Sequence, residues 1–208
     1  MKTIGVIDYG MGNLHSVINA LEFIGVPVFV SSDKNELEKS SALILPGVGA
    51  FGDASKILSD TGLDSFIVSQ AEKKPLLGIC LGMQLLFEYS QEFGYHRGLG
   101  LIKGGVIKLA ANEKSVDFRI PHMGWNKLVI TPNSAGCPLL QNVADGSFVY
   151  FVHSYKACAG KDNLVAYTEY GEIISAVVQN KAVYGTQFHP EKSEEVGLEI
   201  LRSFFKSV

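Results

Sequence analysis

A cysteine set between two glycines constrains the fold of this chain more than any other feature. Residues 75–79 form a short apolar run typical of a buried strand, and a helical pattern over residues 81–91 follows Cys80 directly. Gly78 and Gly82 flank the cysteine, as expected where a strand turns sharply into a helix and brings neighbouring backbone close. The N–H groups at the start of that helix would favour an ionised nucleophile. The pattern predicts a nucleophile elbow that carries sulfur; the alternative is an inert core cysteine.

Short apolar runs alternate with helical patterns through the N-terminal half. The apolar runs lie at 4–8, 26–30, 42–45 and 75–79, and the helical patterns at 14–24, 51–58 and 66–71, with a short charged one after Asp33. Such continuous apolar strands, separated by helices, are typical of a parallel sheet covered by helices on both faces. We therefore expect an α/β fold with a mostly parallel central sheet.

The character of the pattern changes after residue 94. Strand-like segments follow one another with few helices between them, at 100–109, 127–130, 147–152, 164–169, 173–179 and 182–188. This predicts an antiparallel or mixed strand region in the C-terminal half. A last helix, starting at Ser193 and supported by the two glutamates that follow it, closes the fold.

Composition limits the class of protein. With 208 residues, 47% of them hydrophobic, and no proline-rich, serine-rich or charged linker, we expect one domain over residues 1–208. A net charge of −3 with scattered basic residues argues against a nucleic-acid partner. Cys80, Cys137 and Cys158 have unrelated spacings, which argues against disulfides and zinc motifs. No signal segment or membrane-length apolar run is evident, so we expect a cytoplasmic protein without membrane, metal or cofactor.

A cysteine nucleophile needs a base, and His189 is the strongest candidate among five histidines. It follows a predicted strand, where ligand sites of open α/β sheets gather. Glu191 lies two residues on, so both side chains would point the same way in an extended segment, and the carboxylate would fix the imidazole tautomer. One alternative is that His189 is an ordinary strand-end histidine beside a solvated glutamate. Another is that His153 is the base, although the apolar residues around His153 in the sequence favour a hydrogen-bonded core histidine.

A glycine-rich turn follows the third predicted strand. Gly47, Gly49 and Gly52 formally match the G-x-G-x-x-G pattern of dinucleotide sites. Against that interpretation, the pattern is not on the first strand, and Glu72, at about the expected distance, falls in a helical segment. The turn better suits an oxyanion hole that supplies a backbone N–H alongside that of Leu81.

Three motifs together resemble the class I (triad) glutamine amidotransferases: GICLGMQ at 78–84, PGVG at 46–49 and FHPE at 188–191. Within that family, DYGMGNL at 8–14, PHMGWN at 121–126 and YFVHSY at 150–155 are similar to the glutaminase subunits of imidazole glycerol phosphate synthases. The resemblance extends from residue 4 to the closing helix. It implies a flavodoxin-like fold of the class I amidotransferase type.

The resemblance implies a glutaminase. Cys80 would attack the side-chain carboxamide of L-glutamine, His189 would protonate the departing ammonia, Glu191 would orient the base, and water would resolve the γ-glutamyl thioester. The implied oxyanion hole comprises the Leu81 N–H and the Gly47–Val48 backbone. The implied substrate-binding residues are Gly49, Gln84, Ser154 and Tyr155.

The resemblance also implies a partner. Ammonia would pass, without entering bulk water, to a (β/α)₈-barrel cyclase subunit of a heterodimer that closes the imidazole ring in histidine biosynthesis. Length supports a separate partner, because such a barrel alone needs about 250 residues. The predicted interface comprises Asn13, Pro121, His122, Met123, Gly124, Trp125 and Asn126. Its only tryptophan suits an interface anchor, and the alternative is that Trp125 fills the core.

Two other functions stay open at this point. One is a paralogous glutaminase that feeds a different barrel synthase, for example in sugar amidination, with the same catalytic residues. The other is a non-catalytic binding subunit, which the joint presence of Cys80, His189 and Glu191 disfavours.

The glycine turn suggests a mode of regulation. Gly47 tolerates either sign of φ, so the Gly47–Val48 peptide could aim either its N–H or its C=O at the thiol, although β-branched Val48 resists positive φ. We hypothesise that the free subunit rests with the N–H turned away and that the liganded partner shifts the population. A Gly47→Val variant is the expected test.

Overall fold

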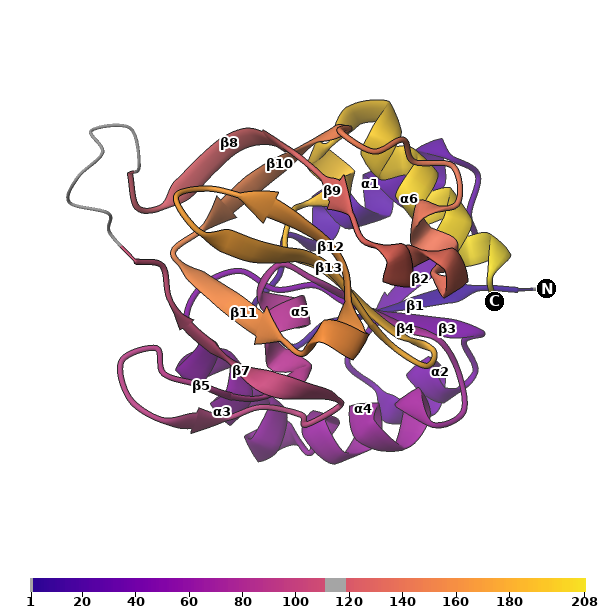
Figure 1. The fold of residues 1–208 in the computed structure, drawn as a ribbon. Coiled ribbons are helices and arrows are strands. Elements are labelled where there is room, and N and C mark those ends of the chain that lie inside the picture. The colour runs from indigo at the N-terminus through magenta and orange to yellow at the C-terminus, as the bar shows by residue number, and fades with distance from the viewer. Residues whose placement is uncertain (1, 111–118) are drawn as a thin grey trace.

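An eight-stranded sheet forms the centre of the structure, a computed structural model that describes residues 2–110 and 119–208 (Figure 1). Its first five strands in spatial order run parallel: β2 (Val28–Ser31), β1 (Ile4–Ile7), β3 (Ala42–Leu45), β4 (Leu76–Ile79) and β14 (Val183–Thr186). Three antiparallel strands extend it: β13 (Ile173–Asn180), β12 (Leu164–Glu169) and β9 (Val129–Ile130). The predicted parallel sheet is confirmed, with an antiparallel extension.

Helices cover both faces of this sheet, as predicted (Figure 1). The helices α1 (Leu14–Phe23) and α6 (Glu194–Lys206) share one hydrophobic cluster, and α2 (Lys34–Glu38), α3 (Phe51–Thr61) and α4 (Leu63–Ala71) share the other. Side chains of β3 alternate between the clusters, with Ile44 in the first and Leu43 and Leu45 in the second. Both faces are therefore apolar, which explains the continuous hydrophobic runs in the sequence.

Two smaller sheets complete the described fold. One pairs β8 (His122–Lys127) with β10 (Phe148–His153) in antiparallel fashion. The other has the order β11 (Tyr155–Ala159), β7 (Ile102–Lys108), β5 (Phe87–Ser90) and β6 (His96–Arg97). The short helices are α5 (Leu81–Leu85), η1 (Pro132–Gly136), η2 (Pro138–Leu140), η3 (Lys161–Asn163) and η4 (Pro190–Lys192). Across residues 2–110 and 119–208, no helix has both the length and the apolar character needed to cross a bilayer.

The helix predicted over residues 81–91 is wrong beyond its first turn. α5 ends at Leu85, and the chain continues as β5, which pairs with β6 and β7. The Leu86 carbonyl accepts hydrogen bonds from Leu101 and Ile102 at 2.9 and 3.0 Å. These partners lie far along the chain, so tertiary pairing overrides the local helical pattern.

The start of the last helix also differs from expectation. The helix begins at Glu194, and the Ser193 side chain does not cap it. Instead Ser193 Oγ accepts a hydrogen bond from the Tyr150 N–H at 3.0 Å and donates one to the His189 carbonyl at 2.6 Å. Ser193 therefore ties β10 to the segment that carries His189.

Candidate active site

Cys80 occupies a sharp turn between β4 and α5. Its backbone angles, φ 54° and ψ −110°, are sparsely populated for a residue with a side chain. A Cβ atom on Gly78 would lie 2.7 Å from the carbonyl oxygen of Gly82, and one on Gly82 would collide with the Leu45 carbonyl. The glycines on either side of the cysteine thus have the steric reason inferred from the sequence. The fold holds the thiol at the carboxyl end of a central strand.

His189 and Glu191 lie beside this turn because β14 pairs directly with β4. His189 Nδ1 and Glu191 Oε1 are 2.7 Å apart, and the two side chains are only 3% and 1% exposed. The His189 N–H donates to the Tyr150 carbonyl at 3.0 Å, which fixes the backbone of the segment. The structure therefore brings together the three residues predicted as a triad.

The electrostatics of His189 follow from these contacts. Burial alone would lower the pKa of His189, but hydrogen bonds to Cys80 and Glu191, together with their negative charge, outweigh burial and raise it. The imidazole can thus hold a proton at neutral pH. A proton held between a sulfur nucleophile and a buried carboxylate is positioned for transfer to a leaving group.

The predicted oxyanion donors are only partly in place. Leu81 directly follows the nucleophile and begins α5. The Val48 N–H, however, donates to the Met11 carbonyl at 3.2 Å, so it is not free to bind an oxyanion at Cys80. Gly47 is enclosed, since a Cβ atom there would lie 2.6 Å from the Tyr9 hydroxyl and 2.9 Å from the Gly82 nitrogen.

A pocket of about 380 Å³ opens over Cys80 and His189. All four residues predicted to bind substrate line it: Gly49, Gln84, Ser154 and Tyr155. Val48 and Leu81 line it too, whereas Gly47 faces a small crevice shared with Asn13, Val48, His189 and Glu191. The volume of the pocket over Cys80 and His189 lies within the range of small-molecule sites in proteins.

Two polar residues of the site were missed from the sequence. Glu92 lines the pocket, and its carboxylate accepts a hydrogen bond from the Phe51 N–H at 2.6 Å. It lies directly after the helical pattern predicted over residues 81–91, where no local signal marked it. Gln187 is fully buried, and its Nε2 lies 3.9 Å from Cys80 Sγ. A polar residue inside the apolar run 182–188 was the signal that could have found it.

His153 is a hydrogen-bonded core histidine, as its surroundings suggested, although it also lines the pocket. Its Nδ1 lies 2.9 Å from the Tyr155 carbonyl and its Nε2 3.0 Å from His122 Nδ1. Burial lowers the pKa of His153 to about 3. A group that stays neutral with both nitrogens engaged is poorly placed to act as the base.

A family model described as glutamine amidotransferase class-I matches residues 5–208. The chain belongs to this family. It is 52% identical to the imidazole glycerol phosphate synthase subunit HisH of Geobacillus kaustophilus over 204 residues, 97% of this chain and 95% of that protein. It is also 52% identical to the subunit of the same name from Bacillus subtilis over 206 residues, 98% of this chain and 95% of that protein.

Solved structures of other proteins share the fold of this class-I amidotransferase. A crystal structure of a glutamine amidotransferase aligns with a TM-score of 0.74 at 20% identity and covers 99% of each chain. The structure of PurLQS from Thermotoga maritima aligns with a TM-score of 0.75 at 23% identity, covering 99% of this chain and 98% of that one. The predicted fold class is confirmed.

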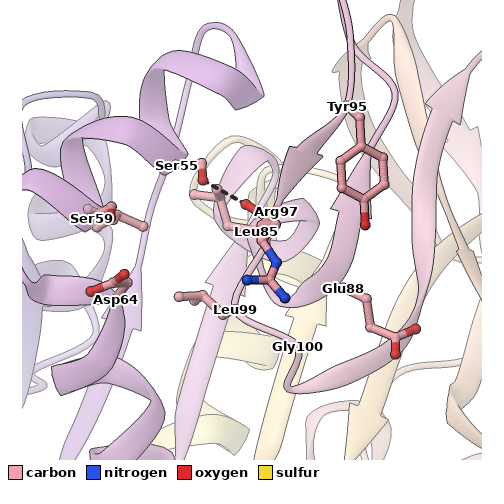
Figure 2. Close-up of a pocket in the computed structure, with 11 residues that line it drawn as sticks. Ser55, Ser59, Asp64, Leu85, Glu88, Tyr95, Arg97, Leu99 and Gly100 are labelled. Atoms are coloured by element: carbon pink, nitrogen blue, oxygen red, sulfur yellow. Dashed lines mark hydrogen bonds between the residues drawn. The ribbon is translucent and has the colours of Figure 1, made fainter.

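A second hollow of this amidotransferase, of about 610 Å³, is larger than the pocket over Cys80 (Figure 2). This hollow lies between the helices α3 and α4 on one side and the strands β5 and β6 on the other. Its polar lining includes Asp64, Glu88, Tyr95 and Arg97. Among the described residues its lining contains no cysteine or histidine. Volume alone would therefore favour the other hollow, whereas the predicted nucleophile and base, Cys80 and His189, both line the smaller pocket.

The residues predicted to bind a partner divide into two groups in this class-I amidotransferase. Met123 and Trp125 are 61% and 46% exposed on β8. The alternative that Trp125 fills the core is therefore wrong. By contrast, His122 is buried, Pro121 lines the pocket, the Asn13 side chain caps α1, and Asn126 bonds the Glu169 carbonyl.

Proposed function

We propose that this chain is the glutaminase subunit of an imidazole glycerol phosphate synthase, with residues 1–208 forming a single glutaminase domain. It would hydrolyse L-glutamine to glutamate and ammonia in the cytoplasm. The observation that carries the proposal is the buried contact of His189 with Glu191 beside Cys80, at the base of a pocket of amino-acid size. The names of relatives 52% identical over nearly the whole chain support the assignment to this synthase.

The geometry supports a thioester mechanism. Cys80 Sγ attacks the carboxamide carbon, and the Leu81 N–H stabilises the oxyanion that forms. The proton on His189 passes to the nitrogen as the C–N bond breaks, so ammonia leaves and a γ-glutamyl thioester remains. His189 then takes a proton from water, which adds to the thioester and releases glutamate and the thiol. Glu191 stabilises the charged imidazole through both steps.

The pocket offers complementary groups for both ends of glutamine. Gln84 would lie near the carboxamide end of glutamine, because Gln84 bonds Gln187, and Gln187 in turn contacts Cys80 Sγ. The Glu92 carboxylate and the Ser154–Tyr155 backbone lie at the pocket wall, where a carboxylate suits the α-ammonium group. Backbone groups of the Gly49 turn complete the lining.

We propose a (β/α)₈-barrel cyclase subunit as the partner in a heterodimer. The exposed Met123 and Trp125 on β8 supply the apolar anchors that interfaces use. β8 pairs with β10, which ends at His153 and is followed by Ser154, and both of these residues line the pocket wall. A partner bound to the paired strands β8 and β10 would therefore sit next to the place where ammonia is released. Asn13, Gly124 and the rest of the segment 121–126 would border that contact.

The test is a Cys80→Ala variant assayed with the cyclase subunit. Glutamine-dependent turnover should fall by roughly a thousandfold or more, because the nucleophile is lost. Turnover with ammonium salts should remain, since the cyclase supplies that chemistry. The exposed Cys158 gives a matched control, and Cys158→Ala should keep both activities. Loss of both activities in Cys80→Ala, or failure of a glutamine-analogue electrophile to label Cys80, would contradict the proposal.

A further inference from the structure

Two side chains converge on one backbone oxygen in the wall of the pocket. The Tyr155 carbonyl lies 3.0 Å from Gln84 Nε2 and 2.9 Å from His153 Nδ1. A carbonyl oxygen can only accept hydrogen bonds, so both facing nitrogens must donate. This oxygen therefore fixes the orientation of the Gln84 amide and the tautomer of His153.

The tautomer of His153 also determines the tautomer of His122. Because His153 carries its hydrogen on Nδ1, its Nε2 is an acceptor, and His122 Nδ1, 3.0 Å away, must donate to it. Burial lowers the pKa of His122 to about 4 and that of His153 to about 3, so both rings stay neutral at neutral pH. His122 is itself held between the Phe151 and Tyr170 rings, at centroid distances of 4.7 and 3.9 Å.

The second hydrogen of the Gln84 amide is also committed. Gln84 Nε2 donates to Gln187 Oε1 at 3.0 Å, and Gln187 then directs its own Nε2 towards Cys80 Sγ. With both N–H groups used, the acceptor Oε1 is the polar atom that the Gln84 side chain can offer to a ligand. Turning the amide over would face oxygen against oxygen at Tyr155 and at Gln187.

We propose that three positioning residues keep the Gln84 oxygen directed towards the pocket, so that the site selects a carboxamide over a carboxylate. Gln187 acts on the Gln84 amide directly, whereas His153, supported by His122, acts by holding the Tyr155 carbonyl that accepts from Gln84. The inference rests on the proposed function, because it concerns how glutamine is distinguished from its product. A carboxamide N–H donates to the Gln84 oxygen, whereas a carboxylate has only acceptors and is repelled by it. The same contact that binds glutamine would therefore help glutamate to leave.

The experiment measures binding without turnover. In the full chain carrying Cys80→Ala, calorimetry gives the dissociation constants of glutamine and glutamate, and their ratio is the readout. Adding His153→Phe or Gln187→Met should reduce the preference for glutamine by roughly fivefold to tenfold, the effect of about one hydrogen bond. Steric changes common to both ligands cancel in the ratio. His153→Asn, which keeps a donor at the Nδ1 position, should restore the preference.

Matched controls use a histidine and a buried glutamine outside the pocket lining, as His96→Phe and Gln70→Met, and should leave the ratio unchanged. The proposal is overturned if the parent shows no preference for glutamine, if the ratio stays within twofold in both test variants, or if His153→Asn fails to rescue. Thermal unfolding reports whether each variant folds, and Gln187→Met gives a second route should His153→Phe unfold. Failure of the glutaminase assignment would appear separately, as no glutamine hydrolysis by the wild-type complex.

Discussion

Two parts of the pocket differ in how completely they are assembled. On one side, His189 and Glu191 are in contact at 2.7 Å beside the nucleophile, almost wholly shielded from solvent. On the other, the Gly47–Val48 turn directs the Val48 N–H to the Met11 carbonyl. The proposed attacking groups are therefore all in place in the isolated chain, whereas one of the two proposed oxyanion donors is turned away.

The difference has a structural origin. The attacking groups follow two strands paired within the sheet, β4 and β14, and Ser193 anchors the base through its carbonyl. The turn follows β3, and Val48 is 42% exposed. A rotation of one peptide would free the Val48 N–H without disturbing the strands. This geometry accords with the hypothesis that a liganded partner switches on hydrolysis by shifting the turn.

The largest effect is expected at His189, on the side of the pocket that holds the predicted triad. His189→Gln should lower glutamine hydrolysis by about a thousandfold, because neither the leaving ammonia nor the attacking water can then exchange a proton with a base. Glutamate release by the partner complex gives the measurement, with His96→Gln as the control. A loss below tenfold would mean that another group serves as the base.

Removal of a single N–H would sharpen the comparison on the other side. Replacing Val48 by its α-hydroxy acid keeps the side chain and exchanges the backbone N–H for an ester oxygen, which cannot donate a hydrogen bond. The activated complex should lose about a hundredfold in kcat, the effect of one oxyanion donor. The basal rate of the isolated chain should hardly change, because there the N–H faces Met11. Equal losses in both states would show that the turn does not switch.

The pH dependence of stability tests how firmly the wall beside the triad is built. The pKa values of His122 and His153, about 4 and about 3, lie below the ordinary 6.5. Between these values the unfolded chain binds more protons, so the free energy of unfolding should fall as the pH drops below 6.5. From pH 7 to 5.5, His153→Asn should lose about 1 kcal/mol less than wild type in urea unfolding. Parallel pH curves would contradict the burial of a neutral pair.

The smallest expected effect is a gain. Val48→Gly removes the β-branched side chain that resists positive φ, so the resting turn should rotate more readily. The isolated chain should hydrolyse glutamine roughly threefold to fivefold faster, and the activated complex at an unchanged rate. The Gly47→Val test suggested by the sequence is less clean, because its Cβ atom would press against Tyr9 and Gly82. An unchanged basal rate in Val48→Gly would argue against rotation at this peptide.

The sequence allowed prediction of whatever depends on local signals. β3 and β12 match the apolar runs at 42–45 and 164–169, and the glycines around Cys80 identified the turn. β5 could not be predicted, because its strand form depends on pairing with β7. β8 was largely missed, since a segment with Pro121, Gly124 and Asn126 resembles a loop until β10 pairs with it.

In the candidate site, too, features with local signals could be predicted, and features that depend on distant residues could not. Its predicted triad consists of motif residues at strand ends, which parallel topology brings together. Gln187 was missed because its meaning depends on Gln84, which lies far along the chain. The direction of the Val48 N–H likewise depends on Met11, in a different loop. Residue types were readable from the sequence, whereas hydrogen-bond directions required the fold.

The position of β14 has a consequence for the order in which the chain becomes active during synthesis. This strand lies between β4 and β13 in the sheet, yet residues 80–182 must be made before it. Until then β4 is the unpaired edge of a four-stranded parallel sheet, with an apolar strand open to misassociation on the ribosome. The thiol meets its base only when this late strand inserts, so a nascent chain carries a nucleophile without a proton donor.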